Sequence, residues 1–362
     1  MIDRVARRVV EMLLRRISVG QLTVIEDGRT TTYGAGPPTA VVQVRSQRIW
    51  RKLLRGSRGF AESYFEGLWD SPDVTAVVRL AARNVGGIDR LRKRLAPVRR
   101  PFQRITAQSP ANTRRRARKS ISAHYDLGND LFELMLDPTM MYSSAIFDRP
   151  GMTLEEASIA KLDRVCDRLD LGPDDHVVEI GTGWGGFAVH AAGTRGCRVT
   201  TTTISREQHD WAVESVRRAG VEHLVTVLLD DYRDLTGTYD KLVSLEMIEA
   251  VGWRDFGTFF RKCSDLLAPD GLMLLQAITI DDRAYEVEKA GSSFINTYVF
   301  PDGCLPSMEV ITRNVARRTD MQAIGLEDIT AHYAETLRRW RHNFVANVDR
   351  AERLGYDRRF QR

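Results

Sequence analysis

The segment that restricts the fold most is VVEIGTGWGGFAVHAA, which runs from Val177 to Ala192. A short apolar run rich in β-branched residues ends at Ile180, a glycine-rich turn follows, and a helix-compatible segment begins at Phe187. Glycines let the backbone adopt conformations closed to other residues and let a ligand approach the chain, while the first N–H groups of the helix point at whatever is bound. The sequence therefore predicts a strand, a tight binding turn and a helix.

The spacing of these glycines indicates the kind of ligand. A dinucleotide-binding turn reads G-x-G-x-x-G, whereas residues 181–186 read G-T-G-W-G-G, with Glu179 two residues ahead. Such a turn suits a ligand with a carboxylate and an ammonium group better than one with a pyrophosphate, and S-adenosylmethionine is a ligand of that kind. A turn whose glycines are purely structural is the alternative.

Strands and helices alternate from Leu154 onward, which is typical of an α/β fold. Strands are expected at residues 177–180, 198–203, 224–229, 241–245 and 272–278. Helices are expected at residues 207–219 and 256–267, and the sequence APDG ends the second of them. The pattern predicts a doubly wound parallel sheet. Ligands of such sheets bind beyond the carboxyl ends of the strands.

Length and composition limit the class of protein. With 362 residues and 43% hydrophobic content, the chain can bury a substantial core and form two domains. No apolar stretch approaches the roughly 20 residues that cross a bilayer, and the charged N-terminus is unlike a secretory signal, so we expect a cytoplasmic protein. The cysteines lie far apart without a C-x-x-C pair, which argues against a metal site and against disulfides; they are Cys166, Cys197, Cys263 and Cys304.

Residues 1–90 are expected to form a smaller N-terminal α+β domain, because a helical start is followed by segments that alternate like strands around a turn at residues 26–28. The opening helix fits either a membrane surface or docking on its own domain. Its expected apolar side consists of Val9, Met12, Leu13 and Ile17.

Residues 91–119 are expected to form a basic linker. From Arg90 to Lys119 there are twelve Arg or Lys residues and no acid, in a chain whose formal net charge is only +5. Such a run favours an anionic partner, and nucleic acid and a membrane surface both qualify. A solvated linker between domains is the alternative.

The loops after the second and third expected strands carry candidate ligand groups. Ser205 and Gln208 have the spacing of a capping box, and Gln208 could also hold the ribose hydroxyls. Asp231 and Tyr232 offer an acid and a ring suited to the amino group and face of an adenine. A surface turn is the alternative for the second pair.

The loop after the fourth expected strand, SLEMIEAVG, places Glu246 and Glu249 in an otherwise apolar turn. A carboxylate in such a setting must be paired, protonated or used, because an isolated buried charge is costly. Gln276, at the end of the fifth expected strand, points to the same side and needs hydrogen-bond partners. The loop lacks the Asn/Asp-Pro-Pro-aromatic sequence of adenine and cytosine N-methyltransferases.

Eight sequence blocks occur in one order between Ser120 and Phe344. They read SAHYDLGNDLFELMLDPTMMYSSAIF, EIGTGWGG, TTISREQ, DYRDL, SLEMIEAVG, LLQAITI, YVFPDGCLPS and HYAETLRRWRHNF. In these blocks the chain resembles the cyclopropane-fatty-acyl-phospholipid synthase family, which includes the mycolic-acid cyclopropane synthases and enzymes that make methylene- or methyl-branched fatty acids. The N-terminal unit resembles that of the phospholipid-acting members, and the resemblance implies that the doubly wound α/β sheet has the Rossmann-like class I methyltransferase fold.

The resemblance implies two sets of site residues. Those expected to hold S-adenosylmethionine are Tyr142, Ser143, Glu179, Gly181, Thr182, Gly183, Trp184, Gly185, Thr203, Ile204, Ser205, Gln208, Asp231, Tyr232 and Arg233. Those expected to hold a bicarbonate ion and to act in catalysis are Ser144, Glu249, Gln276, Ile278 and Tyr333.

Three positions depart from the family pattern. Ser144 stands where the family has Cys, Ala250 where it has His, and Gln276 where it has another His. Serine and glutamine still donate hydrogen bonds to an oxyanion, so the resemblance keeps a bicarbonate site with a changed base strength.

The implied reaction transfers the methyl group of S-adenosylmethionine to the double bond of an unsaturated phospholipid acyl chain. The resulting carbocation needs shelter from water and stabilisation by aromatic faces such as Phe300, Tyr333 or Trp253, and it loses a proton to the bicarbonate. Loss from the new methyl group gives a cyclopropane, and a methylene-branched chain is the alternative product. The basic linker suits transient attachment to the inner face of an anionic membrane, and a homodimer is left open.

Two other classes and one gap remain. A nucleic-acid methyltransferase is disfavoured because no nucleic-acid module is recognisable, and a non-catalytic lipid-binding homologue is disfavoured by the retained cofactor blocks. The chain ends at GYDRRFQR, before the C-terminal strand that sheets of this type normally have, so a domain covering residues 120–362 is expected to lack that strand.

Overall fold

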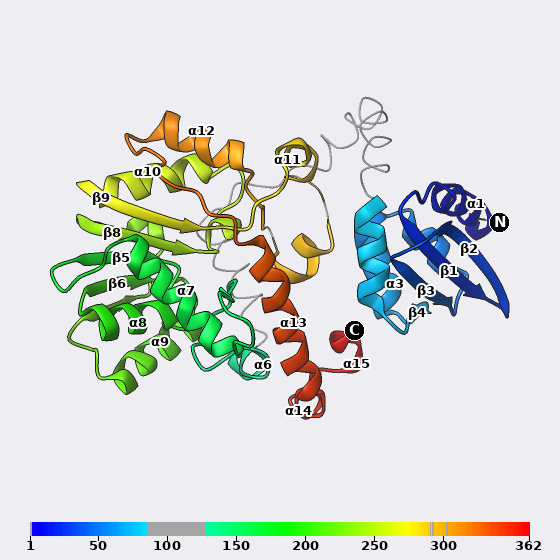
Figure 1. Ribbon diagram of the computed structural model, residues 1–362, viewed down its shortest axis with the longest axis horizontal. Helices are drawn as coiled ribbons and strands as arrows, with labels where there is room; N and C mark the ends of the chain where they lie inside the picture. Colours follow the sequence, from blue (N-terminus) through cyan, green and yellow to red (C-terminus); the bar gives the residue numbers. More distant parts are fainter. Residues whose placement is uncertain (1, 85–127, 290, 292, 302) are drawn as a thin grey trace. The chain divides into compact units, whose positions relative to one another are not determined.

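The computed structural model describes residues 2–84, 128–289, 291, 293–301 and 303–362 (Figure 1). The expected basic linker lies outside these residues. The described residues form two compact units. The first contains residues 2–84, 291, 293–297 and Tyr356–Arg362, and the second contains 128–289, 298–301 and 303–355. The last residues of the chain therefore group with the N-terminal part, although the sequence predicted one domain over 120–362.

The first unit is an α+β fold with a four-stranded sheet in the order β2-β1-β3-β4. Its elements are α1 (Ile2–Leu14), β1 (Gly20–Glu26), β2 (Arg29–Ala35), β3 (Thr39–Val44), α2 (Arg48–Leu53), α3 (Gly56–Phe65), β4 (Trp69–Asp70) and α15 (Arg358–Gln361). β1 pairs with β2 as an antiparallel hairpin and with β3 in parallel. Burial alternates residue by residue along β1, so one face of this strand faces the core.

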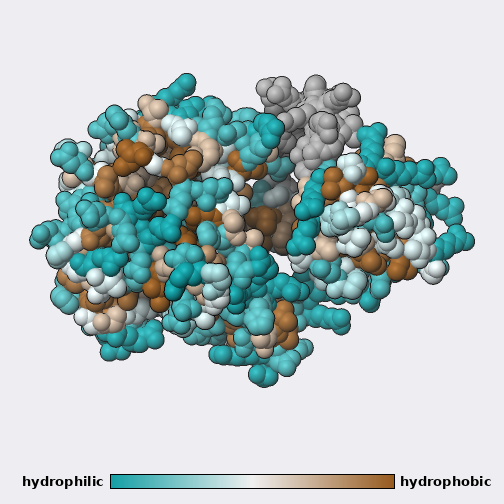
Figure 2. Space-filling view, viewed as in Figure 1, coloured by the Kyte–Doolittle hydropathy of each residue, from teal (hydrophilic) through white to brown (hydrophobic). Residues whose placement is uncertain are grey.

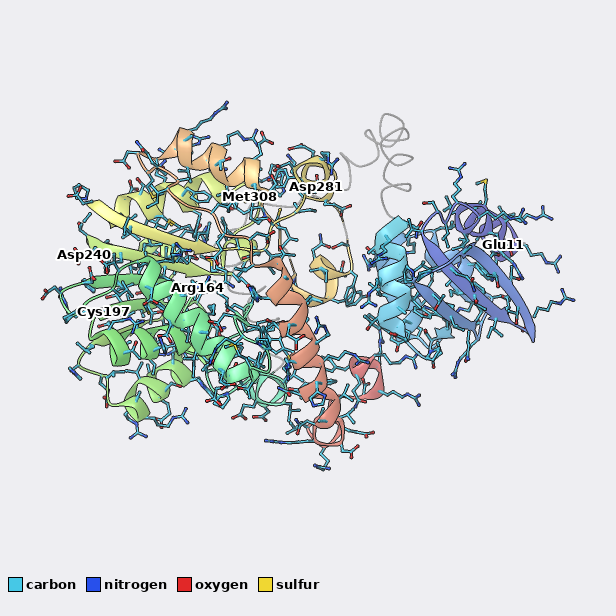
Figure 3. The ribbon with its side chains drawn as sticks, in the orientation of Figure 1. Glu11, Arg164, Cys197, Asp240, Asp281 and Met308 are labelled. Carbon is cyan, nitrogen blue, oxygen red and sulfur yellow. The ribbon has the colours of Figure 1, made fainter. Side chains whose placement is uncertain are left out.

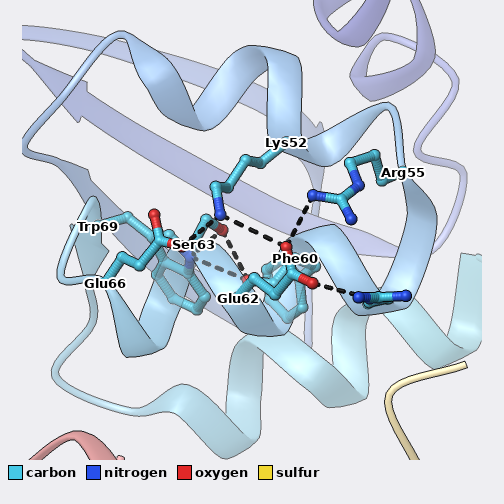
Figure 4. A network of polar contacts seen from close by, with 8 residues as sticks. Lys52, Arg55, Phe60, Glu62, Ser63, Glu66 and Trp69 are labelled. Atoms are coloured by element: carbon cyan, nitrogen blue, oxygen red, sulfur yellow. Dashed lines mark hydrogen bonds and ion pairs between the residues drawn. The ribbon is translucent and has the colours of Figure 1, made fainter. Parts of the chain in front are cut away.

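Trp69 lies at the centre of the first unit and is fully buried. Its ring stacks on Phe60 at 4.8 Å between centroids, and its indole Nε1 donates to Ser63 Oγ at 3.0 Å. In α3, the buried side chain of Glu62 accepts a hydrogen bond from Arg55 at 2.9 Å (Figure 4). Helix α3 thus contributes an aromatic contact and a buried carboxylate with its ion-pair partner to this unit.

Helix α1 docks on this core through a different face from the one predicted. Ala6 and Val10 are buried in the core cluster, whereas Val9 and Met12 are exposed. Both alternatives for the predicted apolar side are met in part, because Ile17 packs against the core whereas Val9 and Met12 remain exposed.

The second unit contains a five-stranded parallel sheet in the order β7-β6-β5-β8-β9, which confirms the predicted doubly wound α/β fold. Its strands are β5 (His176–Ile180), β6 (Arg198–Thr202), β7 (Val225–Leu228), β8 (Tyr239–Leu245) and β9 (Leu267–Gln276). A helix end was predicted at Leu267, but β9 begins there. Leu267 pairs with Tyr239 of β8, and the register between the two strands shifts after this pair.

The helices of this unit lie between and after the strands. They are α6 (Asn129–Glu133), α7 (Leu154–Arg168), α8 (Gly186–Arg195), α9 (Arg206–Ala219), η1 (Tyr232–Asp234), η2 (Ile248–Ala250), α10 (Phe256–Leu266), α11 (Asp282–Glu288), α12 (Met308–Arg318), α13 (Thr330–Ala346) and α14 (Val348–Arg353). A further short helix, η3 (Ile295–Val299), spans residues of both units. No helix among the described residues is long and apolar enough to cross a membrane.

Alternate strand residues face two separate cores. Val177 of β5 belongs to the cluster formed with α7, α8 and α9, whereas its neighbour Val178 belongs to the cluster formed with α10 and α12. The sheet is therefore covered on both faces, as in other parallel sheets. On the face of the molecule shown in Figure 2, apolar residues appear in small groups among polar ones.

The strand order reverses between β5 and β8. β5, β6 and β7 follow one another to one side, and β8 returns to the other side of β5. Ligands of such folds bind beyond the carboxyl ends of the strands at this point. In Figure 3, Cys197 and Asp240 label the amino ends of β6 and β8, so the candidate site lies at the opposite ends of these strands.

Candidate active site

The glycine-rich turn joins β5 to α8 as predicted. Three of its glycines have left-handed backbone, with φ values of 103° at Gly181, 53° at Gly183 and 90° at Gly185. The N–H of Gly181 donates to the carbonyl of Thr202 at 3.1 Å, which ties the turn to the end of β6. A Cβ added to Gly181 would lie 3.0 Å from Met247, so the turns after β5 and β8 are in close contact. Side chains other than hydrogen are excluded here by both conformation and space.

Glu179 precedes this turn and is buried. Its carboxylate accepts a hydrogen bond from Thr201 Oγ1 at 2.6 Å, and the same hydroxyl lies 2.7 Å from Thr182 Oγ1. Burial raises the pKa of Glu179 to about 8, although the hydrogen bond from Thr201 acts to lower it. The carboxyl group therefore holds a proton at neutral pH. The hydroxyl of Thr201 in β6 thus links Glu179 and Thr182, two of the residues expected to bind the ligand.

The loop after β6 carries an unsatisfied amide. Thr203 Oγ1 donates to Gln208 Oε1 at 2.8 Å, while the buried Nε2 of Gln208 has no hydrogen-bond partner. Ser205 caps α9, accepting from the N–H of Gln208 at 3.2 Å. Of the predicted capping box, the hydrogen bond to Ser205 is formed, whereas the Gln208 side chain bonds to Thr203 and not to the backbone N–H of Ser205. Ile204, between these residues, is half-buried.

The loop after β7 holds an ion pair within the loop itself. Both oxygens of Asp231 accept hydrogen bonds from Arg233, at 2.8 Å from Nε and 2.6 Å from Nη2. The ring of Tyr232 contacts the edge of Phe259 at 5.7 Å. Asp231, predicted to bind an adenine amino group, is thus engaged by Arg233 and supports the shape of the loop.

Trp184, in the middle of the glycine turn, faces an aromatic cluster. It is buried, its Nε1 donates to Asn129 Oδ1 at 2.8 Å, and its ring lies 4.7 Å from that of Phe132. Tyr142 lies 5.2 Å from Phe132 and 5.1 Å from Trp340. The cluster anchors the glycine turn and the segment that carries Tyr142 to one another.

Glu246 is the centre of the polar network at the end of β8. Its Oε1 accepts from the backbone N–H of Ser144 and from Nε2 of Gln276, both at 2.8 Å. Its Oε2 accepts from the hydroxyl of Tyr333 at 3.2 Å. Burial raises the pKa of Glu246, against the hydrogen bonds from Ser144 and Gln276, and burial likewise raises the pKa of Tyr333. Three of the predicted catalytic residues thus meet at a carboxylate that was not among them.

Glu249 lies one turn further along the chain, in η2. Its Oε1 accepts from the N–H of Ile278 at 2.5 Å, and its buried Oε2 has no hydrogen-bond partner. Burial, followed by the charge of Glu246, raises the pKa of Glu249 to about 8. Glu249 is therefore a neutral acid at neutral pH, with an oxygen available to a ligand.

A family model described as mycolic acid cyclopropane synthetase matches residues 112–362. The chain belongs to this family. It is therefore an S-adenosylmethionine-dependent methyltransferase of the cyclopropane synthase type, as the resemblance implied.

Curated relatives and solved structures agree with the family match. Tuberculostearic acid methyltransferase of Mycobacterium tuberculosis is 37% identical over 98% of this chain and 84% of its own. Cyclopropane-fatty-acyl-phospholipid synthase of Escherichia coli is 35% identical over 86% of this chain and 78% of its own. The mycolic acid cyclopropane synthase CmaA1, solved with SAH and CTAB, is 31% identical with a TM-score of 0.62, covering 67% of this chain and 88% of that one.

The loops after β5 and β6 fit the methyl donor of this family. Gly183, with left-handed backbone and open space where a Cβ would lie, lets a ligand approach the turn, and the unpaired Nε2 of Gln208 offers a buried hydrogen-bond donor at the start of α9. These residues would hold S-adenosylmethionine, which when bound supplies an electrophilic sulfonium methyl group.

The residues expected to hold bicarbonate do not fit that ion as they lie. The N–H of Ser144, the amide of Gln276 and the hydroxyl of Tyr333 all donate to Glu246. The Ser144 hydroxyl donates to the carbonyl of Ala145, and Ala250 is exposed. A second oxyanion at the same donors would face the Glu246 carboxylate at close range, which is unfavourable.

Sequence reasoning missed Lys161, a fully buried lysine in α7. Its Nζ donates to Ser143 Oγ at 2.9 Å, and burial lowers its pKa to about 8, against the charges of Glu246 and Glu179. The sequence did carry a signal for Lys161. It lies one helical turn after Ala157, on the apolar side of α7, where a buried lysine needs acidic neighbours.

Replacing Gln208 with leucine tests the donor assignment. Leucine removes the unpaired Nε2 and also the Oε1 that accepts from Thr203, so we expect S-adenosylmethionine affinity to fall about tenfold and the free protein to lose about 1–3 kcal/mol of stability. Calorimetric titration and thermal unfolding measure the two effects. A side chain with a purely structural role would lose the same stability and leave affinity for the donor as it was.

Proposed function

We propose that this chain transfers the methyl group of S-adenosylmethionine to the double bond of an unsaturated phospholipid acyl chain and forms a cyclopropane. The observation that carries the proposal is the contact between the donor turn and the Glu246 network. Met247 follows Glu246 directly and would touch a side chain at Gly181. A methyl donor in the glycine turn and a proton acceptor in the network would therefore act on neighbouring atoms of one substrate.

Aromatic side chains beside the network suit a cationic intermediate. Tyr142 lies between the rings of Phe300, at 6.2 Å, and Trp340, at 5.1 Å. Tyr333 contacts the edge of Trp340 at 6.2 Å. Each aromatic face can stabilise a neighbouring cation by about 0.5–2 kcal/mol, and the cluster also excludes water.

The choice of a lipid substrate rests on the named relatives. The Escherichia coli relative acts, by its name, on the fatty acyl chains of phospholipids. The solved synthase with 31% identity was crystallised with CTAB, a single-chain detergent. Both support an acyl chain as the methyl acceptor in this protein. We propose that the protein reaches this chain by binding transiently to the inner face of an anionic membrane.

Helix α1 supplies a surface for that binding. Val5, Val9 and Met12 are 58%, 36% and 52% exposed and lie on one side of the helix, with the exposed Arg4 and Arg8 beside them. Apolar side chains can enter the headgroup region while arginines contact anionic lipids.

Replacing Val9 and Met12 together with aspartate is expected to lower binding to vesicles of anionic phospholipid about tenfold, because two apolar contacts are lost and two like charges are added. Sedimentation with the vesicles measures the loss. Val78→Asp, at a residue of the same unit that is 50% exposed, is the matched control. Equal binding by both variants and the unaltered protein would remove α1 from the proposal.

A methylene branch is the second candidate product. The observation in its favour is that the tuberculostearic acid methyltransferase, named for a methyl-branched fatty acid, matches 98% of this chain. After methyl transfer, a hydride shift followed by proton loss from the new methyl group would give the branch instead of the ring.

The test is incubation with S-adenosylmethionine and monounsaturated phospholipid, followed by mass analysis of the released fatty acids. The proposal predicts a gain of one CH₂ unit that resists mild hydrogenation. Uptake of hydrogen would identify the methylene branch. An unchanged fatty acid in the presence of bound donor would contradict both candidates.

A further inference from the structure

Glu246 makes contacts that the family resemblance assigns to a bound ion. Its carboxylate collects donors from three distant parts of the second unit: Ser144, in the segment after α6, Gln276 at the end of β9, and Tyr333 in α13. Bicarbonate and a carboxylate present the same planar pair of oxygens to such donors. One carboxylate already satisfies all three.

We propose that the Glu246 carboxylate takes the place of bicarbonate and is the proton acceptor of the methyl-transfer reaction. The inference rests on the proposed function, since the proton is released only after methyl transfer to the lipid. It predicts an enzyme that carries its own base and needs no dissolved carbonate.

The backbone at Glu246 supports a functional role for this side chain. Glu246 has φ of 51°, a left-handed conformation that costs a residue with a side chain roughly 1–2 kcal/mol. Its N–H donates to the carbonyl of Gln276 at 2.8 Å, which fixes the strained residue on the end of β9. A glycine would relieve the strain, so the presence of a glutamate indicates that its carboxylate is used.

Burial raises the pKa of Glu246, and the hydrogen bonds and the positive charge near its carboxylate oppose that rise. Glu249, with an unpartnered oxygen and one hydrogen bond from Ile278, holds a proton at neutral pH. Lys161 lies close enough to favour the charged form of Glu246, and three hydrogen bonds reach the Glu246 carboxylate itself. Of the two neighbouring acids, Glu246 is therefore the one suited to accept a proton.

The chemical step balances without another reactant. The methyl carbon bonds to one alkene carbon as its bond to sulfur breaks, which leaves a thioether and a cation on the other alkene carbon. A C–H bond of the new methyl group then breaks, its electron pair closes the ring, and the proton goes to an oxygen of Glu246. After product release the carboxylic acid returns the proton to water.

The test compares the unaltered protein with Glu246→Gln in buffers depleted of carbon dioxide and in buffers with added bicarbonate. We expect the unaltered protein to methylate lipid equally in both. We expect Glu246→Gln to be about 100 to 10,000 times slower in both, with S-adenosylmethionine affinity changed less than about threefold. Glu214→Gln, at a half-buried acid of α9 that pairs with Arg217, is the control for loss of one negative charge.

Glu246→Gly separates a base from a structural support. This variant suits the left-handed backbone and frees the three donors, so added bicarbonate or acetate is expected to restore at least about a tenth of the lost rate. In Glu246→Gln, slower proton loss is expected to let water capture the cation, giving a hydroxylated methyl-branched chain. A purely structural residue would show neither anion rescue nor a new product.

Three results would overturn the inference. Activity of the unaltered protein only with bicarbonate would do so while leaving the proposed function intact, and so would an unimpaired Glu246→Gln. An unaltered protein that methylates no lipid in either buffer would overturn the proposed function and this inference with it.

Discussion

Gly181→Val is expected to lower S-adenosylmethionine affinity by at least about a hundredfold and to destabilise the second unit by about 2–4 kcal/mol. Two costs add. The backbone φ of 103° lies outside the range that a β-branched residue adopts readily, and the new Cβ would lie 3.0 Å from Met247. Moving Met247 also moves Glu246, so both the donor turn and the proton acceptor are displaced.

Gly193→Val is the matched control for this substitution. Gly193 lies near the C-terminal end of α8, the helix that follows the turn, with helical backbone and open space around the position of a Cβ. Calorimetric titration with S-adenosylmethionine and urea unfolding should show little change for the control. Normal donor affinity in Gly181→Val would contradict the placement of the donor in this turn.

The free energy of unfolding is expected to fall by a few kcal/mol as the pH rises from about 4.5 to about 8. Burial raises the pKa of Glu179 and of Glu249 to about 8, from a value of 4.5 in the unfolded chain. Between these values the folded protein keeps two protons that the unfolded chain releases. The stability linked to them is fully present below pH 4.5 and is lost as the pH passes through 8.

Lys161 adds nothing to this slope below pH 8. Its pKa is lowered from 10.5 to about 8, so its own contribution appears only above that range, where the folded state releases a proton first and stability rises.

The double variant Glu179→Gln, Glu249→Gln should show a flatter pH dependence than the unaltered protein, because glutamine mimics the protonated acid at every pH. Urea unfolding at about pH 5.5 and about pH 7.5 measures the difference. An equal slope in both proteins would mean that these acids are ionised in the folded state.

The sheet of the second unit was predictable because its strands are short apolar runs followed by loops with recognisable ends. The glycine turn after Ile180 and the Ser205 cap of α9 follow directly from residue type and spacing. The start of β9 was not predictable, because APDG reads as a helix end while pairing with Tyr239 extends the strand. The buried face of α1 was missed for a similar reason, since tertiary contacts decide which side of the helix packs on the core.

The resemblance indicated which residues lie near one another at the end of β8, but it did not indicate their contacts. Ser144, Gln276 and Tyr333 come together as the resemblance implied, yet the group at which they meet is Glu246. Sequence reasoning noticed that Glu246 must be paired or used, but only the left-handed turn after β8 directs its side chain toward those donors. Lys161 was hidden because its partner, Ser143, lies on another segment.

Transfer of a labelled methyl group tests the central claim most directly. The protein is incubated with S-adenosylmethionine carrying a radioactive methyl group and with vesicles of either monounsaturated or fully saturated phospholipid of the same headgroup. We predict label in the released fatty acids of the unsaturated lipid alone. Label in the headgroup, or in fatty acids of both lipids, would show that the acceptor is not a carbon–carbon double bond.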